Sequence, residues 1–70
     1  MSTKHLPERI GDLPAIGRPA NGALLAHGTT TLAGVAALGE RGLLALHGVG
    51  PRVVRLLREA LAERGVELAP

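Results

Sequence analysis

Cysteine, tryptophan, tyrosine and phenylalanine are all absent from this 70-residue sequence. Without cysteine the chain has no disulfide framework, no thiolate ligand for zinc and no cysteine nucleophile. Without aromatic rings it has no platform on which bases could stack, as they do in single-strand and RNA binders. A domain this short needs disulfides, a metal or very regular helix packing, and the residues present leave helix packing.

Charge is also scarce, because only 20% of the residues are charged and the formal net charge is +2. A net charge of +2 is too small to indicate a nucleic-acid partner by itself. Residues 19–39 carry no charge, but Asn21, three threonines and four glycines interrupt this run, so we predict no membrane span. The first fourteen residues contain no apolar run typical of a signal peptide. We therefore expect a soluble, cytoplasmic protein.

Apolar residues make up 46% of the sequence, mainly 13 leucines and 11 alanines, which indicates a folded domain. We expect a flexible lead-in over residues 1–11 and one domain over residues 12–68. Glycine and proline divide this domain at intervals of about one short helix. The predicted helical segments are 13–16, 20–27, 32–38, 40–46 and 52–64. No alternation of period two appears, so the predicted fold class is all-α, a compact bundle of four to five short helices.

Residues at the segment ends support these helices. Asp12 is placed to cap the turn over 13–16, and Thr30 or Thr31 to cap the segment that begins at Leu32. Gly28 follows one predicted helix and is a typical helix terminator. The last segment is the most clearly amphipathic. Its apolar arc holds Val53, Val54, Leu56, Leu57, Ala60 and Leu61, and its arginines lie on the opposite arc.

A two-glycine turn, Gly48-Val49-Gly50, precedes this last helix. We expect its outer glycines to permit backbone angles and close approaches that a Cβ would block, with Val49 pointing into the core. Backbone amides at the start of the following helix favour an anion, and Arg52 and Arg55 add positive charge nearby. This arrangement suits a DNA phosphate contacted without reading sequence. The alternative is a tight helix connector beside solvated arginines.

The segment 43–57 resembles a helix-hairpin-helix motif, and Leu13–Gly17 with its proline-led helix resembles a weaker first copy. Together they are similar to a tandem helix-hairpin-helix domain with a SAM-like bundle. Within that group the chain resembles the C-terminal domain of the bacterial RNA polymerase alpha subunit and small stand-alone bacterial relatives. Arg18-Pro19-Ala20-Asn21 and Gly48-Val49-Gly50-Pro51-Arg52 carry the resemblance.

In that family the Arg and Asn of an R-x-A-N segment enter the DNA minor groove, and the second hairpin grips the flanking backbone. The resemblance therefore implies groove contacts by Arg18 and Asn21. The helical wheel places Asn21 toward the apolar side, so a buried amide at the helix start is the alternative. A lysine that the family carries one turn later is Leu24 here, which thins the basic surface. The candidate DNA-binding residues are Arg18, Asn21, Gly48, Val49, Gly50, Arg52 and Arg55.

Other chemistry has little support in the sequence. The three histidines, at positions 5, 27 and 47, have no metal-ligand spacing, and no nucleophile, phosphate-loop or dinucleotide motif is present. We expect no enzymatic activity, no metal and no cofactor. The sequence favours a module that binds double-stranded DNA at its backbone and minor groove, largely without sequence specificity. The alternative is a protein-protein interaction module of SAM-like fold with no nucleic-acid role.

Overall fold

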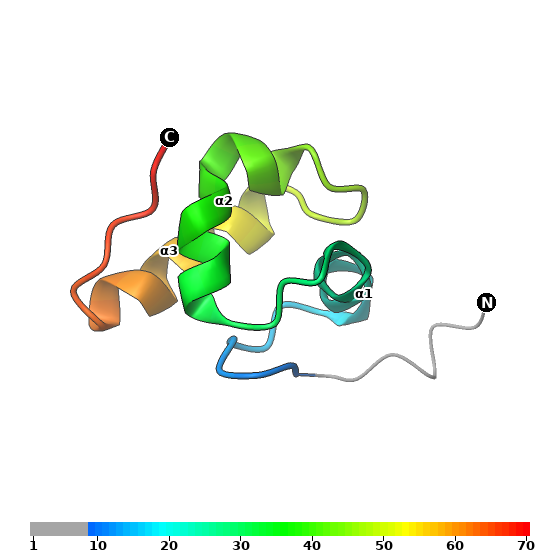
Figure 1. Ribbon diagram of the computed structural model, residues 1–70, viewed down its shortest axis with the longest axis horizontal. Helices are drawn as coiled ribbons and strands as arrows, with labels where there is room; N and C mark the ends of the chain where they lie inside the picture. The colour runs from blue at the N-terminus through cyan, green and yellow to red at the C-terminus, as the bar shows by residue number, and fades with distance from the viewer. Residues whose placement is uncertain (1–8) are drawn as a thin grey trace.

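The computed structural model describes residues 9–70, which form three helices and no strand. The helices are α1 (Arg18–His27), α2 (Leu32–Leu44) and α3 (Pro51–Glu63), shown in Figure 1. The all-α prediction is thus confirmed for the described residues. α2 spans both segments predicted between residues 32 and 46, and the segment 13–16 is not helical. Most of the predicted lead-in, residues 1–8, lies outside the described residues.

None of the three described helices is both long and apolar enough to cross a lipid bilayer.

A glycine flanks α1 at each end. Gly17 has φ 95°, which a residue with a Cβ rarely adopts, and Pro19 follows in the first turn, where its missing N–H costs nothing. At the other end Gly28 adopts the left-handed conformation. The backbone N–H of Gly28 donates to the carbonyl of Leu25 at 3.0 Å, and that of Thr29 to the carbonyl of Leu24 at 2.8 Å.

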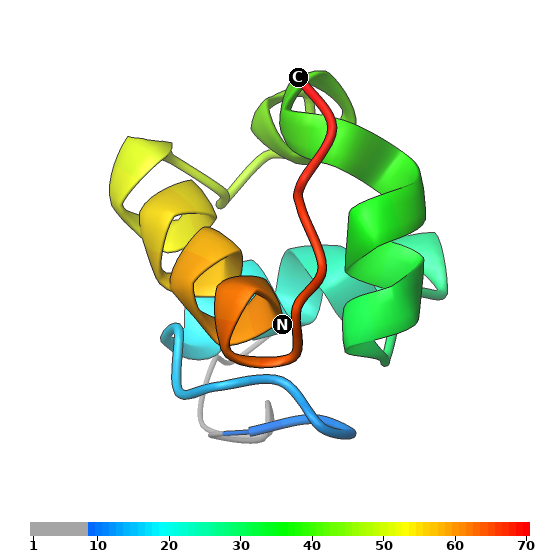
Figure 2. The ribbon, with the colours of Figure 1, turned by 90° about the vertical axis from the view of Figure 1, so that its left-hand side faces the viewer.

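α2 is capped as predicted, because the Thr31 hydroxyl accepts a hydrogen bond from the Gly34 N–H at 3.0 Å. The helix bends at Gly39, whose φ of 73° and ψ of 172° are not helical, and Figure 2 shows the change of direction. The bend separates residues 32–38 from 40–44, close to the predicted boundary. Beyond it, the freed N–H of Glu40 donates to the carbonyl of Ala69 at 2.7 Å. The C-terminal segment, red in Figure 2, therefore holds the bend of α2.

Asp12 has a different role from the predicted one. Its Oδ1 accepts a hydrogen bond from the N–H of Leu32, the first residue of α2, at 2.8 Å. Its Oδ2 forms an ion pair with Arg64 at 3.0 Å, just beyond the end of α3. The prediction that it caps residues 13–16 was wrong, because a single turn fixes many dihedral angles for one hydrogen bond. The hydrogen bond from α2 and the ion pair with Arg64 stabilise the Asp12 carboxylate more than the cap of a single turn would.

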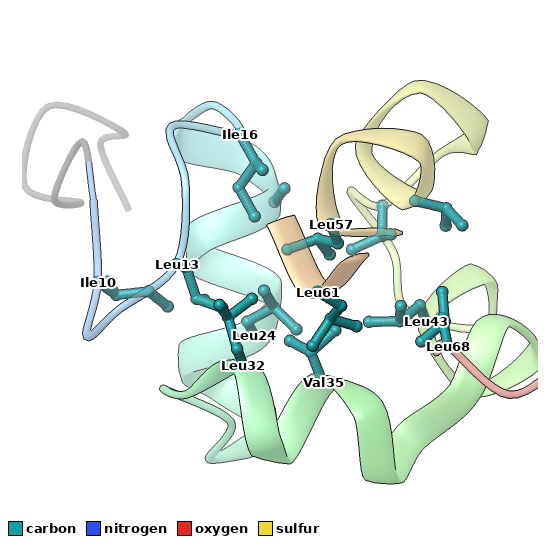
Figure 3. Packing of buried hydrophobic residues seen from close by; sticks show 13 residues of the cluster. Ile10, Leu13, Ile16, Leu24, Leu32, Val35, Leu43, Leu57, Leu61 and Leu68 are labelled. Carbon is teal, nitrogen blue, oxygen red and sulfur yellow. The ribbon is translucent and has the colours of Figure 1, made fainter. Parts of the chain in front are cut away.

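The core is built from aliphatic side chains of all three helices. Leu24 of α1, Val35 of α2, and Leu57 and Leu61 of α3 are almost completely buried and converge in Figure 3. On α3 the predicted apolar arc is confirmed, with Val54, Leu57 and Leu61 buried and the rest partly buried. Ile10 and Leu68, near the two ends of the described chain, also join this core. Short helices with small side chains thus enclose one core without aromatic rings.

Candidate nucleic-acid interface

The turn between α2 and α3 has the predicted form around Gly48 and Val49. Gly48 has φ 101°, in the region where side chains are strained. The N–H of Val49 donates to the carbonyl of Leu46 at 3.2 Å, and the Val49 side chain is buried in the core. Val49 therefore anchors the turn from inside, and the residues on either side of it remain at the surface.

Gly48 also brings the turn against the start of α1. A Cβ at this position would lie 2.8 Å from the Pro19 carbonyl oxygen and 3.6 Å from the Ala23 Cβ. The first of these distances is too short for real carbon–oxygen contact, so only glycine fits without a shift of the backbone. The beginnings of the two proline-led helices, α1 and α3, consequently lie on the same side of the molecule.

Gly50 does not match the prediction for the outer glycines. Its φ of −119° and ψ of −176° are ordinary extended values, and nothing lies within 4 Å of an added Cβ. The extended conformation is the one that any residue favours before proline, here Pro51. Gly50 acts as the N-cap residue of α3, and its carbonyl accepts a hydrogen bond from Val54 N–H at 3.1 Å. Its need for glycine is therefore much weaker than that of Gly48.

The arginines of the described chain differ in how they are compensated. Arg58 pairs with Glu40 at 2.8 Å, and Arg64 pairs with Asp12 at 3.0 Å. Arg52 and Arg55, in the first turns of α3, are exposed and pair with no carboxylate within residues 9–70. Positive charge that is not locally neutralised thus remains beside the two-glycine turn.

The first and last residues of the R-x-A-N segment differ in exposure. Arg18, the first residue of α1, is exposed, whereas Asn21 has none of its surface exposed. The neighbouring Ala20 and Leu24 are buried as well, so Asn21 lies within the inward face of α1. This position favours the alternative that the wheel indicated, an amide that fixes the start of the helix.

Sequence reasoning missed one feature near the turn. His27 of α1 and His47 of the turn line one open hollow, although twenty residues separate them in the sequence. Their shared position depends on the Gly48 contact with α1, which no local pattern reveals. The described residues contain no group of three or more histidine, aspartate or glutamate side chains suited to a metal ion.

No family model, no curated protein and no solved structure matches this chain.

Proposed function

We propose that this protein is a non-enzymatic module that holds duplex DNA at its backbone and minor groove, largely without reading sequence. The observation that carries this proposal is the packing of Gly48 against the Pro19 carbonyl. It brings the turn that precedes α3 against the start of α1. Arg18, Arg52 and Arg55 are all exposed, and in this proposal they face the same duplex.

Each part of this surface has a chemical role in the proposal. The segment 40–44, the turn and α3 form a helix-hairpin-helix unit whose first helical amides face a phosphate oxygen, with the helix dipole favouring the negative charge. Arg52 adds a full charge to this phosphate site, and Arg55 reaches the next phosphate. Arg18, at the start of α1, enters the adjacent minor groove, where a narrow groove attracts arginine. Asn21 supports the helix start from inside.

The lack of aromatic residues fits this mode of binding, because the contacts go to phosphates and the groove rather than to stacked bases. Two other arginines, Arg58 and Arg64, are already paired with carboxylates. Arg52 and Arg55 pair with no carboxylate within residues 9–70, so the proposal counts two cations at DNA phosphates. The logarithm of the binding constant should then fall with the logarithm of the salt concentration with a slope of about −2.

The first test is fluorescence anisotropy with labelled duplexes at low salt. Arg52→Ala should weaken binding about fivefold to tenfold on AT-rich and GC-rich duplexes alike and reduce the salt slope by about 0.9. Arg64→Ala is the matched control. It removes the same charge just beyond the other end of α3, where that charge is already paired with Asp12. The proposal is wrong if wild type does not bind at low salt, or if both variants lose the same affinity.

The alternative is a protein-interaction module, and the exposure of large apolar side chains favours it. Leu25, Leu44 and Val66 are 38%, 45% and 39% exposed. In that case NMR amide shifts should change over an apolar face on adding the partner, and duplex DNA should leave the amides of Gly48 to Arg55 unchanged. Sedimentation shows in the same sample whether two copies associate.

A further inference from the structure

An open hollow of about 290 Å³ lies between α1 and the turn that precedes α3. We call it the α1–hairpin hollow, and it is lined by Ala23, Ala26, His27, Leu46 and His47. The Cβ of Ala23 also lies 3.6 Å from the position that a Cβ added at Gly48 would occupy. The hollow therefore continues the candidate interface along α1, away from Arg18.

The two polar side chains of this hollow are both imidazoles, and both residues are exposed. The Nδ1 of His27 lies 3.1 Å from the hydroxyl oxygen of the buried Thr29, which orients the ring. Within residues 9–70 the Nε2 of His27 has no hydrogen-bond partner. His47 directly precedes Gly48 and so lies next to the two-glycine turn.

The charged side chains on the elements around the hollow are arginines. α1 contributes Arg18, α3 contributes Arg52 directly after Pro51, and residues 42–50 contain no arginine, lysine, aspartate or glutamate. No carboxylate lies on α1 or in residues 42–50. Histidine is the side chain that ordinarily changes its charge between about pH 8 and about pH 5. A proton taken up by either imidazole would add positive charge to this face.

We infer that His27 and His47, when protonated, contact phosphates of the bound duplex, so that DNA binding at this surface strengthens as the pH falls. The inference rests on the proposed function and adds a regulation to the same site. A protonated imidazole donates from both ring nitrogens, whereas a neutral one donates from one. His27 can thus keep its hydrogen bond with the Thr29 hydroxyl and donate a second hydrogen bond to a phosphate from Nε2.

The geometry of the helix fits a DNA strand that follows the hollow. His27 lies eight residues after Pro19, which is about 12 Å along α1 at about 1.5 Å per residue. A DNA strand presents a phosphate about every 3.4 Å along the duplex axis. A strand that is held at the two-glycine turn and runs along α1 would bring further phosphates to the far end of the hollow.

The first experiment compares DNA affinity and its salt dependence at about pH 7.5 and about pH 5.5. Wild type should bind roughly tenfold more tightly at the lower pH, with a salt slope steeper by up to about 1.8, equivalent to two more phosphate contacts. The double variant His27→Gln/His47→Gln should lose most of this gain. Arg64→Ala, which lies outside the hollow and leaves both imidazoles in place, is the control and should keep the gain.

A second measurement uses the reciprocity of linked equilibria. If proton uptake tightens DNA binding, bound DNA must favour proton uptake by the same imidazoles. NMR titration of the histidine rings should show the midpoints of His27 and His47 moving to higher pH when DNA is present.

The possible outcomes distinguish a failure of the histidine inference from a failure of the proposed DNA binding. If the double variant gains as much affinity as wild type on acidification, the histidine contact is refuted while the Arg52 site stands. If the midpoints of His27 and His47 do not move with DNA bound, the same conclusion follows. If wild type binds no duplex at either pH and low salt, the proposed function itself fails.

Discussion

Two glycines of one turn meet different physical demands. Gly48 has a positive φ and lies so close to the Pro19 carbonyl that a side chain would collide with backbone. Gly50 is extended and borders open space. A Gly-x-Gly pattern in the sequence treats the two positions as equivalent, although only the first is fixed by both conformation and packing.

We expect Gly48→Ala to lower the free energy of unfolding by about 2 to 3 kcal/mol, from backbone strain and from the displaced Pro19 carbonyl. Gly50→Ala should cost less than about 1 kcal/mol, because alanine adopts the extended conformation and loses only the preference for glycine at an N-cap. Chemical denaturation of the two variants measures both values. Equal losses would contradict the distinction between the two glycines.

At the scale of elements, Asp12 links three parts of the chain. The residue itself precedes α1, its Oδ1 accepts the first amide of α2, and its Oδ2 pairs with Arg64 after α3. The ion pair is partly exposed, with the two side chains 55% and 36% accessible, so it adds less than about 1 kcal/mol. Most of the contribution of Asp12 therefore comes from the hydrogen bond to α2.

Asp12→Ala should lower the free energy of unfolding by about 1 to 2 kcal/mol, because the Leu32 N–H loses its acceptor. Asp12→Asn keeps an acceptor oxygen and should cost less. Arg64→Ala, which removes only the ion pair, is the control and should cost under about 1 kcal/mol. Thermal unfolding followed by circular dichroism ranks the three variants. The assignment is wrong if Asp12→Asn is as unstable as Asp12→Ala.

Local signals in the sequence predicted the elements well. Pro51 and the apolar arc defined α3, Thr31 and Leu32 the start of α2, and Gly28 the end of α1, because each signal acts within a few residues. The hydrogen bond from Leu32 to Asp12 and that from Glu40 to Ala69 each span twenty residues or more, and they leave no local pattern.

For the candidate site, the turn and its arginines were predicted from sequence, and their arrangement was not. The inward position of Asn21 followed from the helical wheel. The contact of Gly48 with α1 and the shared hollow of His27 and His47 depend on how helices far apart in the sequence pack. A single sequence offers no measure of that packing.

For the whole molecule, residues near both ends of the described chain complete the core. Leu68 is 9% exposed and lies in the cluster formed by the helices. The next residue, Ala69, accepts the amide hydrogen freed by the bend of α2. The C-terminal segment therefore stabilises the bend in α2, and the second part of α2 leads from this bend to the two-glycine turn.

Leu68→Ala should lower the free energy of unfolding by about 2 kcal/mol, the low end for truncation of a buried leucine, because the residue lies at the edge of the core. Val66→Ala, at a residue that is 39% exposed, is the matched control and should change stability by less than about 0.5 kcal/mol. Urea unfolding curves give both values. A loss for Leu68→Ala no larger than the control would show that the segment does not stabilise the core.

The contact between Gly48 and the Pro19 carbonyl also shapes how this protein can diverge. Neither partner in it is a side chain, so no second substitution elsewhere can restore a fit that a Cβ at position 48 has destroyed. Paired changes between sequences, by which side-chain contacts are usually detected, cannot arise there. In an alignment of descendants this junction would register only as a glycine that never changes, and a designer who redraws the surface around it must leave that single position alone.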